Sequence, residues 1–388
     1  MAVALSLAWI VSGIDAEAGP VDLSVMTQNL YLGADTTPIL DAQTPAQLQA
    51  AVQAAAQSVV LNNFPARAAA IASEAAAAGG PLLIGLQEAE IISSAAGSLN
   101  YADTLISALA AKGLHYTYMI PGVGNAVHTG FSLASNGFHV TDQEVVLVRT
   151  GVPGFSVSGV SAPTFVNNVT LNSPLLGPIP LDRGYVRVDA TLDGTPFEFV
   201  STHLDETHSA AEPAEVGEIL AALGAGGEPQ LVVGDFNAAP SDTCGGLPCG
   251  PADMVAAGFA DTAAALGALG PTCCQPPDLD NPVSALSKRY DYIFERNFSS
   301  VEAAFLVGNT PFEAVRPIWP SDHAGVVAEV TVPEPSAASF LVPAIILAIG
   351  LGLRLPVGRQ IAGARLSAAS RREPASKLCV EAFMNTSG

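Results

Sequence analysis

The chain has 388 residues, 49% of them hydrophobic and 13% charged. This is enough apolar material for one large globular domain or two ordinary ones, and it excludes a disordered chain. Its net charge of −21 is uneven, because six of the fifteen basic residues and only two of the 36 acidic residues follow residue 353. The rest of the chain carries 9 basic and 34 acidic residues, a net charge of −25. Such a surface repels nucleic-acid backbones and anionic membranes unless cations intervene, although solubility is the simpler interpretation of most of these carboxylates.

The N-terminal residues have the pattern of an export signal. Residues 2–11 (AVALSLAWIV) form a short apolar stretch, and residues 15–18 (DAEA) end in the small residues typical of a cleavage site. We therefore interpret residues 1–18 as a signal peptide, although no basic residue precedes the apolar stretch. A first core strand is the alternative, and it is disfavoured because another predicted strand follows at once.

The chain then alternates between predicted strands and helices. Thr44 followed by Pro45 is typical of a helix start, and the Ala- and Gln-rich run after them predicts a helix to about residue 61. A second helix is predicted over residues 65–78, ending at Gly79 and Gly80. Strands are predicted at residues 23–26, 82–86, 116–120, 144–149, 185–192, 196–202, 231–233, 290–294 and 325–332.

The segments between these elements also carry signals. Asp193 and Gly194 lie between two alternating strands and predict a two-residue hairpin, so part of the sheet is antiparallel. Residues 151–180 and 238–283 are rich in Pro, Gly and Asn and predict long loops. Loops of that length commonly carry function or disulfides.

Four cysteines, Cys244, Cys249, Cys273 and Cys274, lie in these loop regions. In an exported domain they imply up to two disulfides, with three pairings open. Cys244 and Cys249 flank a Gly-Gly pair and could bond to each other. A zinc site is the alternative, and it is disfavoured because no histidine stands between or beside these cysteines in the sequence.

The C-terminal segment, residues 333–388, has the pattern of a membrane anchor. Residues 336–353 (SAASFLVPAIILAIGLGL) carry no charge and are long enough to span a membrane, with a basic tail after them. A buried core helix is the alternative, because Pro343 and several glycines disfavour a spanning helix. Residues 332–336 (VPEPS), the apolar span and the arginines resemble the PEP-CTERM sorting signal of bacterial envelope proteins. The resemblance implies processing by an exosortase and location at the cell envelope, in the periplasm or at the cell surface, with release as an alternative fate.

Polar side chains recur where the predicted apolar strands begin or end. The set is Asn29, Glu88, His203, Asp235, Asn237, Asp291, Asp322 and His323. Oxygen ligands with few histidines suit Mg²⁺ or Mn²⁺ better than Zn²⁺. Such an ion can neutralise a phosphoryl oxygen and lower the pKa of water, which is what phosphodiester hydrolysis requires. Taken singly, each residue also fits a structural role in a turn, a helix cap or the core.

Six motifs in a fixed order carry a resemblance to a known family. They are QNLYLGAD, LQE, STHLD, GDFNAAPSD, RYDYIF and SDHAGV. Together, over residues 21–332, they resemble the endonuclease/exonuclease/phosphatase superfamily. That superfamily includes deoxyribonuclease I and neutral sphingomyelinases. The resemblance implies an α/β fold, a four-layer α/β/β/α sandwich of two mostly antiparallel sheets flanked by helices, for a domain at residues 19–332.

The resemblance also implies a role for each residue of the set. Glu88 matches the family's main metal ligand, with Asn29 beside it and Asp322 as a second metal or site carboxylate. Asp235 matches the residue that binds or activates the attacking water, and Asn237 the residue that orients that water or the phosphate.

Four further roles follow from the same resemblance. His323 matches the histidine that contacts the scissile phosphate, and Asp291 matches the carboxylate that pairs with it. His203 matches the histidine that assists departure of the leaving oxygen. Arg183, in DRGYVRV, lies where related sequences often place a phosphate-facing basic residue.

The function predicted is therefore an exported, monomeric, Mg²⁺- or Mn²⁺-dependent phosphodiesterase. Its substrate is open among DNA, a phospholipid head group and a small phosphoester, because the family acts on all of these. A catalytically idle envelope or matrix module on the same fold is one alternative, and it would be expected to lose a catalytic position. A zinc- or calcium-binding module is another, which metal analysis would distinguish.

Overall fold

The computed structural model describes residues 21–334, apart from 95–96, 136, 268 and 314–316. The predicted signal peptide, the apolar span 336–353 and the basic tail lie outside the described residues. Among the residues that are described, no helix is both long and apolar enough to cross a membrane.

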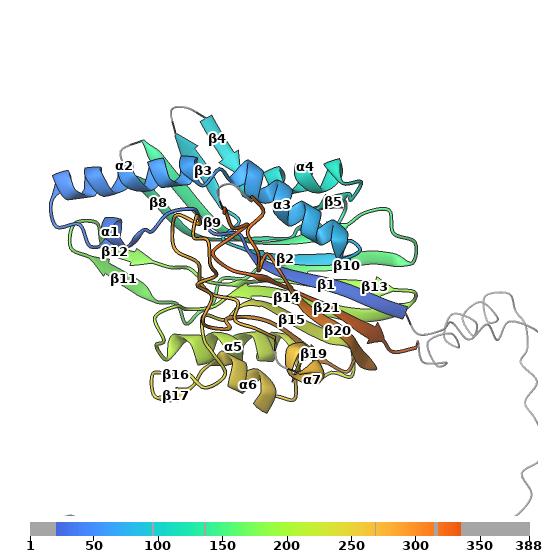
Figure 1. The fold of residues 1–388 in the computed structure, drawn as a ribbon. Coiled ribbons are helices and arrows are strands. Elements are labelled where there is room, and N and C mark those ends of the chain that lie inside the picture. The colour runs from blue at the N-terminus through green and yellow to red at the C-terminus, as the bar shows by residue number, and fades with distance from the viewer. Residues whose placement is uncertain (1–20, 95–96, 136, 268, 314–316, 335–388) are drawn as a thin grey trace, which may run out of the picture. The chain divides into compact units, whose positions relative to one another are not determined.

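Two β-sheets form the centre of this part of the chain (Figure 1). The first runs in the order β20 (Ser300–Val307), β21 (Gly325–Val332), β1 (Val21–Asn29), β2 (Leu83–Gln87), β9 (Phe138–Arg149), β3 (Ile91–Ser94) and β4 (Gly97–Asn100), and β5 (Tyr116–Thr117) and β8 (Val127–Ser135) also pair with β9. The second runs in the order β10 (Phe155–Ser161), β13 (Tyr185–Leu192), β14 (Thr195–His203), β15 (Gln230–Asp235), β19 (Asp291–Arg296) and β18 (Ala260–Asp261). In these two sheets only β1 with β2 and β14 with β15 pair in parallel.

Alternating side chains hold the two sheets together. Because neighbouring residues of a strand point to opposite faces, Val25 of β1 packs against the second sheet while Met26 packs beneath helices. In β15, Leu231 and Val233 face the first sheet and Val232 faces the other way. Continuous apolar runs such as LVV are therefore buried on both faces, as expected for the central strands of a layered fold.

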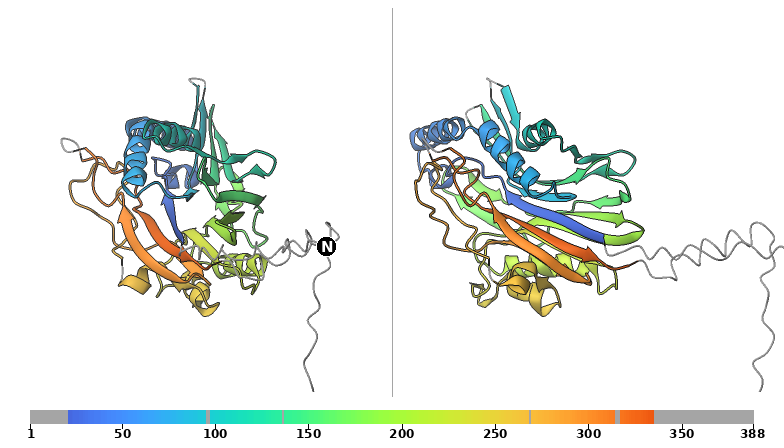
Figure 2. Two further views of the ribbon diagram at one scale, coloured as in Figure 1. Left: turned by 90° about the vertical axis from the view of Figure 1, so that its right-hand side faces the viewer. Right: turned by 45° about the vertical axis from the view of Figure 1, so that its right-hand side comes forward.

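Helices cover both outer faces. On the first sheet lie α2 (Pro45–Leu61), α3 (Phe64–Ala77) and α4 (Tyr101–Ala111), and on the second lie α5 (Ala211–Leu223), α6 (Gly250–Ala256) and α7 (Thr262–Leu266) (Figure 1 and the turned views of Figure 2). Thr44 begins α2 with a reciprocal capping box, in which its side chain accepts from the backbone of Gln47. The predicted four-layer α/β/β/α sandwich is confirmed.

Some local predictions were wrong. The strand predicted at residues 116–120 is interrupted, because β5 ends at Thr117 and a separate strand, β6 (Met119–Ile120), pairs with β7 (Gly124–Asn125) instead. The predicted loop 151–180 contains β10 and a hairpin of β11 (Thr170–Ser173) and β12 (Gly177–Pro180). The predicted loop 238–283 contains α6, α7, β18 and a short hairpin of β16 (Thr243–Cys244) and β17 (Leu247–Pro248). Most of these elements are short, between two and seven residues, so local propensity signals them only weakly and tertiary contacts decide their structure.

The strand pairing explains where polar residues gather. The parallel partners β1 and β2 end together, with Asn29 opposite Gln87, and β14 and β15 end together, with His203 opposite Asp235. The antiparallel strand β19 begins there, because Asp291 lies opposite Asp235. The described chain enters and leaves at the other edge, where Val21 pairs with Val332 (Figure 1).

Candidate active site

All eight residues of the predicted set lie at this shared edge of the sheets. Asn29, His203 and Asp235 end strands, Glu88 follows β2, Asp291 begins β19, and Asp322 and His323 precede β21. Five of these side chains are buried, among them Asn29 (0% exposed), Asp235 (1%) and His323 (5%). Glu88, Asn237 and Asp322 are half-buried. Gly234 brings β15 to this point with a φ of 148°, and a Cβ there would lie 2.0 Å from the Thr202 carbonyl oxygen. The glycine of GDFN is therefore required by the close approach of two backbones.

Asn29 links the two sheets through its side-chain amide. Its Nδ2 donates to Glu88 Oε1 at 3.0 Å and to Asp235 Oδ2 at 3.0 Å. Its Oδ1 accepts from the Tyr31 backbone N–H at 2.9 Å, which fixes the amide orientation. The other Glu88 oxygen accepts from the Leu32 N–H at 3.0 Å. One amide therefore holds a carboxylate of the first sheet beside a carboxylate of the second.

His323 is embedded among carboxylates. Its Nδ1 lies 2.8 Å from Asp291 Oδ2 and 3.6 Å from Asp235 Oδ2. Burial lowers the pKa of His323, but the negative charges of Asp291 and Asp235 outweigh it and hold that pKa well above its usual value. Burial raises the pKa of the Asp235 carboxyl to about 7 against the opposing effect of His323. A protonated imidazole thus lies next to a carboxyl group that titrates near neutral pH.

The protonation state of His203 differs from that of His323, because Arg183 contacts His203. Arg183 Nη1 lies 2.7 Å from His203 Nδ1 and 3.1 Å from Asp142 Oδ2. A guanidinium only donates hydrogen bonds, so Nδ1 is the acceptor and Nε2 carries the proton. Burial and the charge of Arg183 hold the pKa of His203 well below its usual value. His203 is therefore a neutral imidazole whose Nε2–H lies 3.7 Å from Asp235 Oδ2.

Asn237 completes the second-sheet side of the site. Its backbone N–H donates to Asp235 Oδ1 at 2.8 Å, and its Nδ2 donates to the Leu204 carbonyl at 3.0 Å. The residue has a φ of 51°, which asparagine tolerates better than most residues. The strained backbone turns the chain back directly after Asp235 and keeps both side chains at the edge.

Four side chains that the sequence did not single out support the site. Glu90, Asp142 and Glu144 are buried around Arg183, and burial raises the pKa of Glu90 and of Asp142. Arg67 of α3 is fully buried and donates to four backbone carbonyls, those of Leu30, Tyr31, Asn62 and Pro320. A signal for Arg67 was present, since it lies on the apolar face of its helix at i+3 from Phe64 and i−4 from Ile71.

The residues at the edge fit a hard divalent cation. Burial, with the nearby charge of Glu88, raises the pKa of Asp322 to about 7 against the opposing charge of His323. Asp291 Oδ1 is buried without a hydrogen-bond partner among the described residues, and ligand atoms of Asp235, Asp291 and His323 lie within 4.8 Å of one another. Concentrated carboxylate oxygens with an unsatisfied buried acceptor are the donor set that Mg²⁺ and Mn²⁺ prefer.

The cysteines pair within their own loops, Cys244 with Cys249 and Cys273 with Cys274. The sequence argument against zinc was incomplete, because the fold brings His208 beside the first pair and His323 beside the second. Cysteines joined in disulfides have no free thiolate to offer a metal. The second pair lies at the site, where Cys274 Sγ is 3.7 Å from His323 Nε2.

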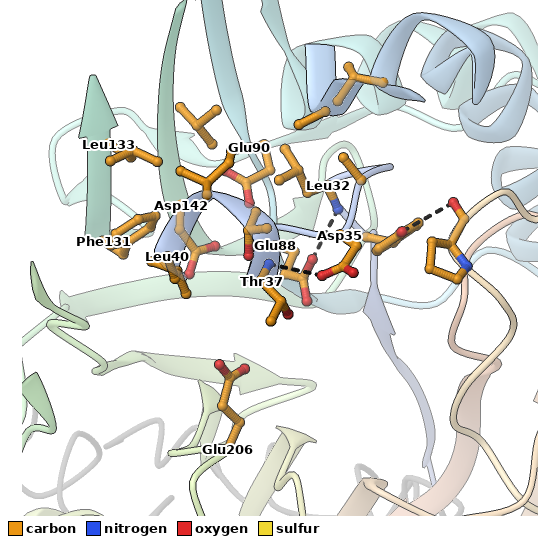
Figure 3. Close-up of a pocket in the computed structure, with 18 of the residues that line it drawn as sticks. Leu32, Asp35, Thr37, Leu40, Glu88, Glu90, Phe131, Leu133, Asp142 and Glu206 are labelled. Atoms are coloured by element: carbon orange, nitrogen blue, oxygen red, sulfur yellow. Dashed lines mark hydrogen bonds between the residues drawn. The ribbon is translucent and has the colours of Figure 1, made fainter. Parts of the chain in front are cut away.

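A pocket of about 440 Å³ lies beside the site, and Glu88 is among the residues that line it. Figure 3 shows Glu88, Glu90 and Asp142 within it, and Glu206 on the facing side. His203, Arg183 and Asp322 also line it. The polar edge of the sheets is thus the wall of a concave site of the size that small ligands occupy.

Comparison with known proteins adds a likeness to solved structures. No protein-family profile matches the sequence, and no curated protein sequence matches it. A truncated TDP2 from Caenorhabditis elegans is 17% identical over 80% of this chain and 98% of its own, with a TM-score of 0.46. An endonuclease/exonuclease/phosphatase family protein from Bacteroides thetaiotaomicron is 18% identical over 81% and 99%, with a TM-score of 0.49. One from Leptotrichia buccalis is 14% identical over 79% and 99%, also with a TM-score of 0.49. A likeness of this degree carries no argument about activity, which has to come from the site.

Proposed function

We propose that the protein is a metal-dependent phosphodiester hydrolase in which water attacks phosphorus. One observation carries the proposal: Asn29 Nδ2 joins Glu88 of one sheet to Asp235 of the other at 3.0 Å each, with His203, His323 and Asp291 around them. A structural turn or cap would explain any one of these residues. It would not explain why acids, amides and imidazoles from six separate segments share one buried edge.

The chain's own residues would hold the cation. Glu88, with Asn29 and Asp322, would bind Mg²⁺ or Mn²⁺, whose charge would offset that of the phosphoryl oxygens and lower the pKa of water. Glu88 remains able to act as a ligand, because each of its oxygens accepts only one hydrogen bond in the structure and keeps a lone pair.

Proton transfer would be divided between the second-sheet residues. Asp235, with a pKa near 7, accepts the proton of the attacking water, which Asn237 helps to orient. The His323 imidazolium, held by Asp291, donates to a phosphoryl oxygen as charge develops there. His203, as a neutral imidazole, donates a hydrogen bond from Nε2–H to the leaving oxygen, and this oxygen takes its proton from a water molecule as it departs.

Location and partners are further proposals that rest on sequence patterns alone. Residues 1–18 support export, and residues 333–388 support association with the envelope membrane and exosortase processing. The expected state is a monomer.

Phosphorus NMR on the purified full chain tests the proposed reaction. With Mg²⁺ or Mn²⁺, bis(p-nitrophenyl) phosphate should be converted to its phosphomonoester, and EDTA should stop the conversion. An intact diester with every divalent ion tried would contradict the proposal.

A further inference from the structure

The pocket at the catalytic edge has two chemically different ends. Its polar end contains Glu88, Asp322, His203 and Arg183. Its other end is mainly apolar, with Glu90 and Asp142 also in its lining, and is built from α1 (Thr37–Leu40), α2, β8, β9 and the segment of the β11–β12 hairpin. Figure 3 shows Leu40, Phe131 and Leu133 close to Asp142 and Glu90. We call this second end the apolar chamber and define it by Leu40, Val52, Val59, Phe131, Leu133 and Val140.

The charge around the pocket restricts what can enter. Six acidic residues line it, Asp35, Glu88, Glu90, Asp142, Glu206 and Asp322, and Arg183 is the one Lys or Arg among the described lining residues. That cation is already engaged by Asp142, Glu206 and His203. A ligand with several neighbouring phosphates would have its additional charges next to acidic side chains such as Asp35 and Glu206, without a free cation of the described lining to offset them. A neutral group next to the phosphorus would not.

The shape and composition of the chamber favour an aliphatic group. Its walls are mainly branched aliphatic side chains, of which Val52 is 4% and Val59 8% exposed, and these line the same pocket as Glu88. Phe131 and Phe138 also line the pocket, but the aliphatic side chains outnumber them and give the same contact to any hydrocarbon.

We propose that the apolar chamber binds an alkyl chain esterified to the scissile phosphate, so that the protein prefers alkyl phosphodiesters over polyanionic ones. The inference rests on the proposed hydrolase function and specifies its substrate class. The chain would leave water for a preformed apolar space while the phosphate lies against the catalytic edge.

Chain length provides the test. For p-nitrophenyl phosphodiesters with alkyl groups from methyl to octyl, kcat/KM of the full chain should rise up to about fourfold for each added methylene until the chamber is full. Val59→Phe, which places a ring in the chamber, should abolish the rise. Val60→Phe is the matched control on the same helix, because Val60 is 76% exposed, and it should behave as the wild type. Leu40→Asn provides a second chamber variant should Val59→Phe fold poorly.

Calorimetry of non-hydrolysable alkyl phosphonates separates the binding hypothesis from the hydrolase hypothesis, because it measures binding to the chamber without any reaction. Affinity that rises with chain length and becomes flat in Val59→Phe supports the chamber even if no ester is hydrolysed. Equal kcat/KM and equal affinity for methyl and octyl compounds would overturn the chamber while leaving a hydrolase intact. Long-chain phospholipid in vesicles forms a separate arm: hydrolysis there beyond that of soluble octyl esters identifies membrane lipid as the source of the chain, and its absence identifies soluble esters.

Discussion

The protonation of His203 is fixed by Arg183, which leaves only Nε2 able to donate. The sequence resemblance implied that Arg183 faces the phosphate, and the structure shows its guanidinium also bound to Asp142 and close to Glu206. We therefore propose that Arg183 is a positioning residue, because it would act on the substrate through the His203 imidazole that it orients.

Replacing Arg183 with Met should change the state of His203. With the neighbouring cation gone, the pKa of His203 should rise toward its usual value, although burial still opposes the charged form. Nitrogen NMR of histidine-labelled protein should show the Nε2–H tautomer of His203 in the wild type and its loss in Arg183→Met. The His203 signals are assigned by their absence in His203→Gln. A wild-type ring protonated at Nδ1, or a ring unchanged in Arg183→Met, would refute this role.

The sequence predicted those site residues that directly follow or precede apolar strands. Asn29, Glu88 and Asp235 could be found because a strand delivers them to its end. Asp142 and Glu144 could not, because they lie within β9, where a polar residue usually marks a solvent-exposed face. Only the tertiary arrangement around Arg183 makes those positions buried.

At the scale of elements, prediction succeeded where pattern and caps agreed. The helix α2, which Thr44 caps, and the strand β21 at residues 325–332 were predicted at their observed positions. The helix α5 was missed because its sequence, AEPAEVGEILAAL, contains Pro213 and Gly217, which disfavour a helix locally. Its burial against the second sheet through Val216 and Ile219 compensates for that.

Arg67 joins three elements at the catalytic edge. It connects α3 to the end of β1 through the Leu30 carbonyl at 2.6 Å, and to the segment before β21 through the Pro320 carbonyl at 3.1 Å. Arg67→Met should lower the free energy of unfolding by about 3 kcal/mol or more, because it leaves buried carbonyls without donors. Urea unfolding measures this loss, and the exposed Lys112→Met is the control. Equal stabilities of the two variants would show that the contacts of Arg67 do not hold these elements together.

At the scale of the whole molecule, buried acids make stability depend on pH. Burial raises the pKa of Glu215 from 4.5 to about 8, with the Asp205 N–H opposing the rise. The folded state therefore keeps a proton that the unfolded state releases. The stabilisation is complete below pH 4.5 and is lost as the pH rises toward 8.

Glu215→Gln should remove this dependence. Between pH 6 and 8 the free energy of unfolding of the variant should rise relative to that of the wild type by up to about 1.4 kcal/mol per pH unit. The reason is that unfolding of the variant no longer releases the Glu215 proton. Urea unfolding at several pH values measures the difference, with the exposed Glu228→Gln as the control. Parallel profiles of wild type and Glu215→Gln would contradict the assignment.

The fold brings together residues that lie almost 300 positions apart, such as Asn29 and His323, and the central claim is that they form one catalytic site. The most direct test is kcat/KM for a phosphodiester with Mg²⁺ or Mn²⁺ in Asp235→Asn, compared with Asp278→Asn, an exposed carboxylate in the loop beside the pocket. We expect Asp235→Asn to lose roughly a thousandfold, as removal of a general base does, and Asp278→Asn to stay close to the wild type. An Asp235→Asn variant that retained activity within about tenfold of the wild type would contradict the proposed site.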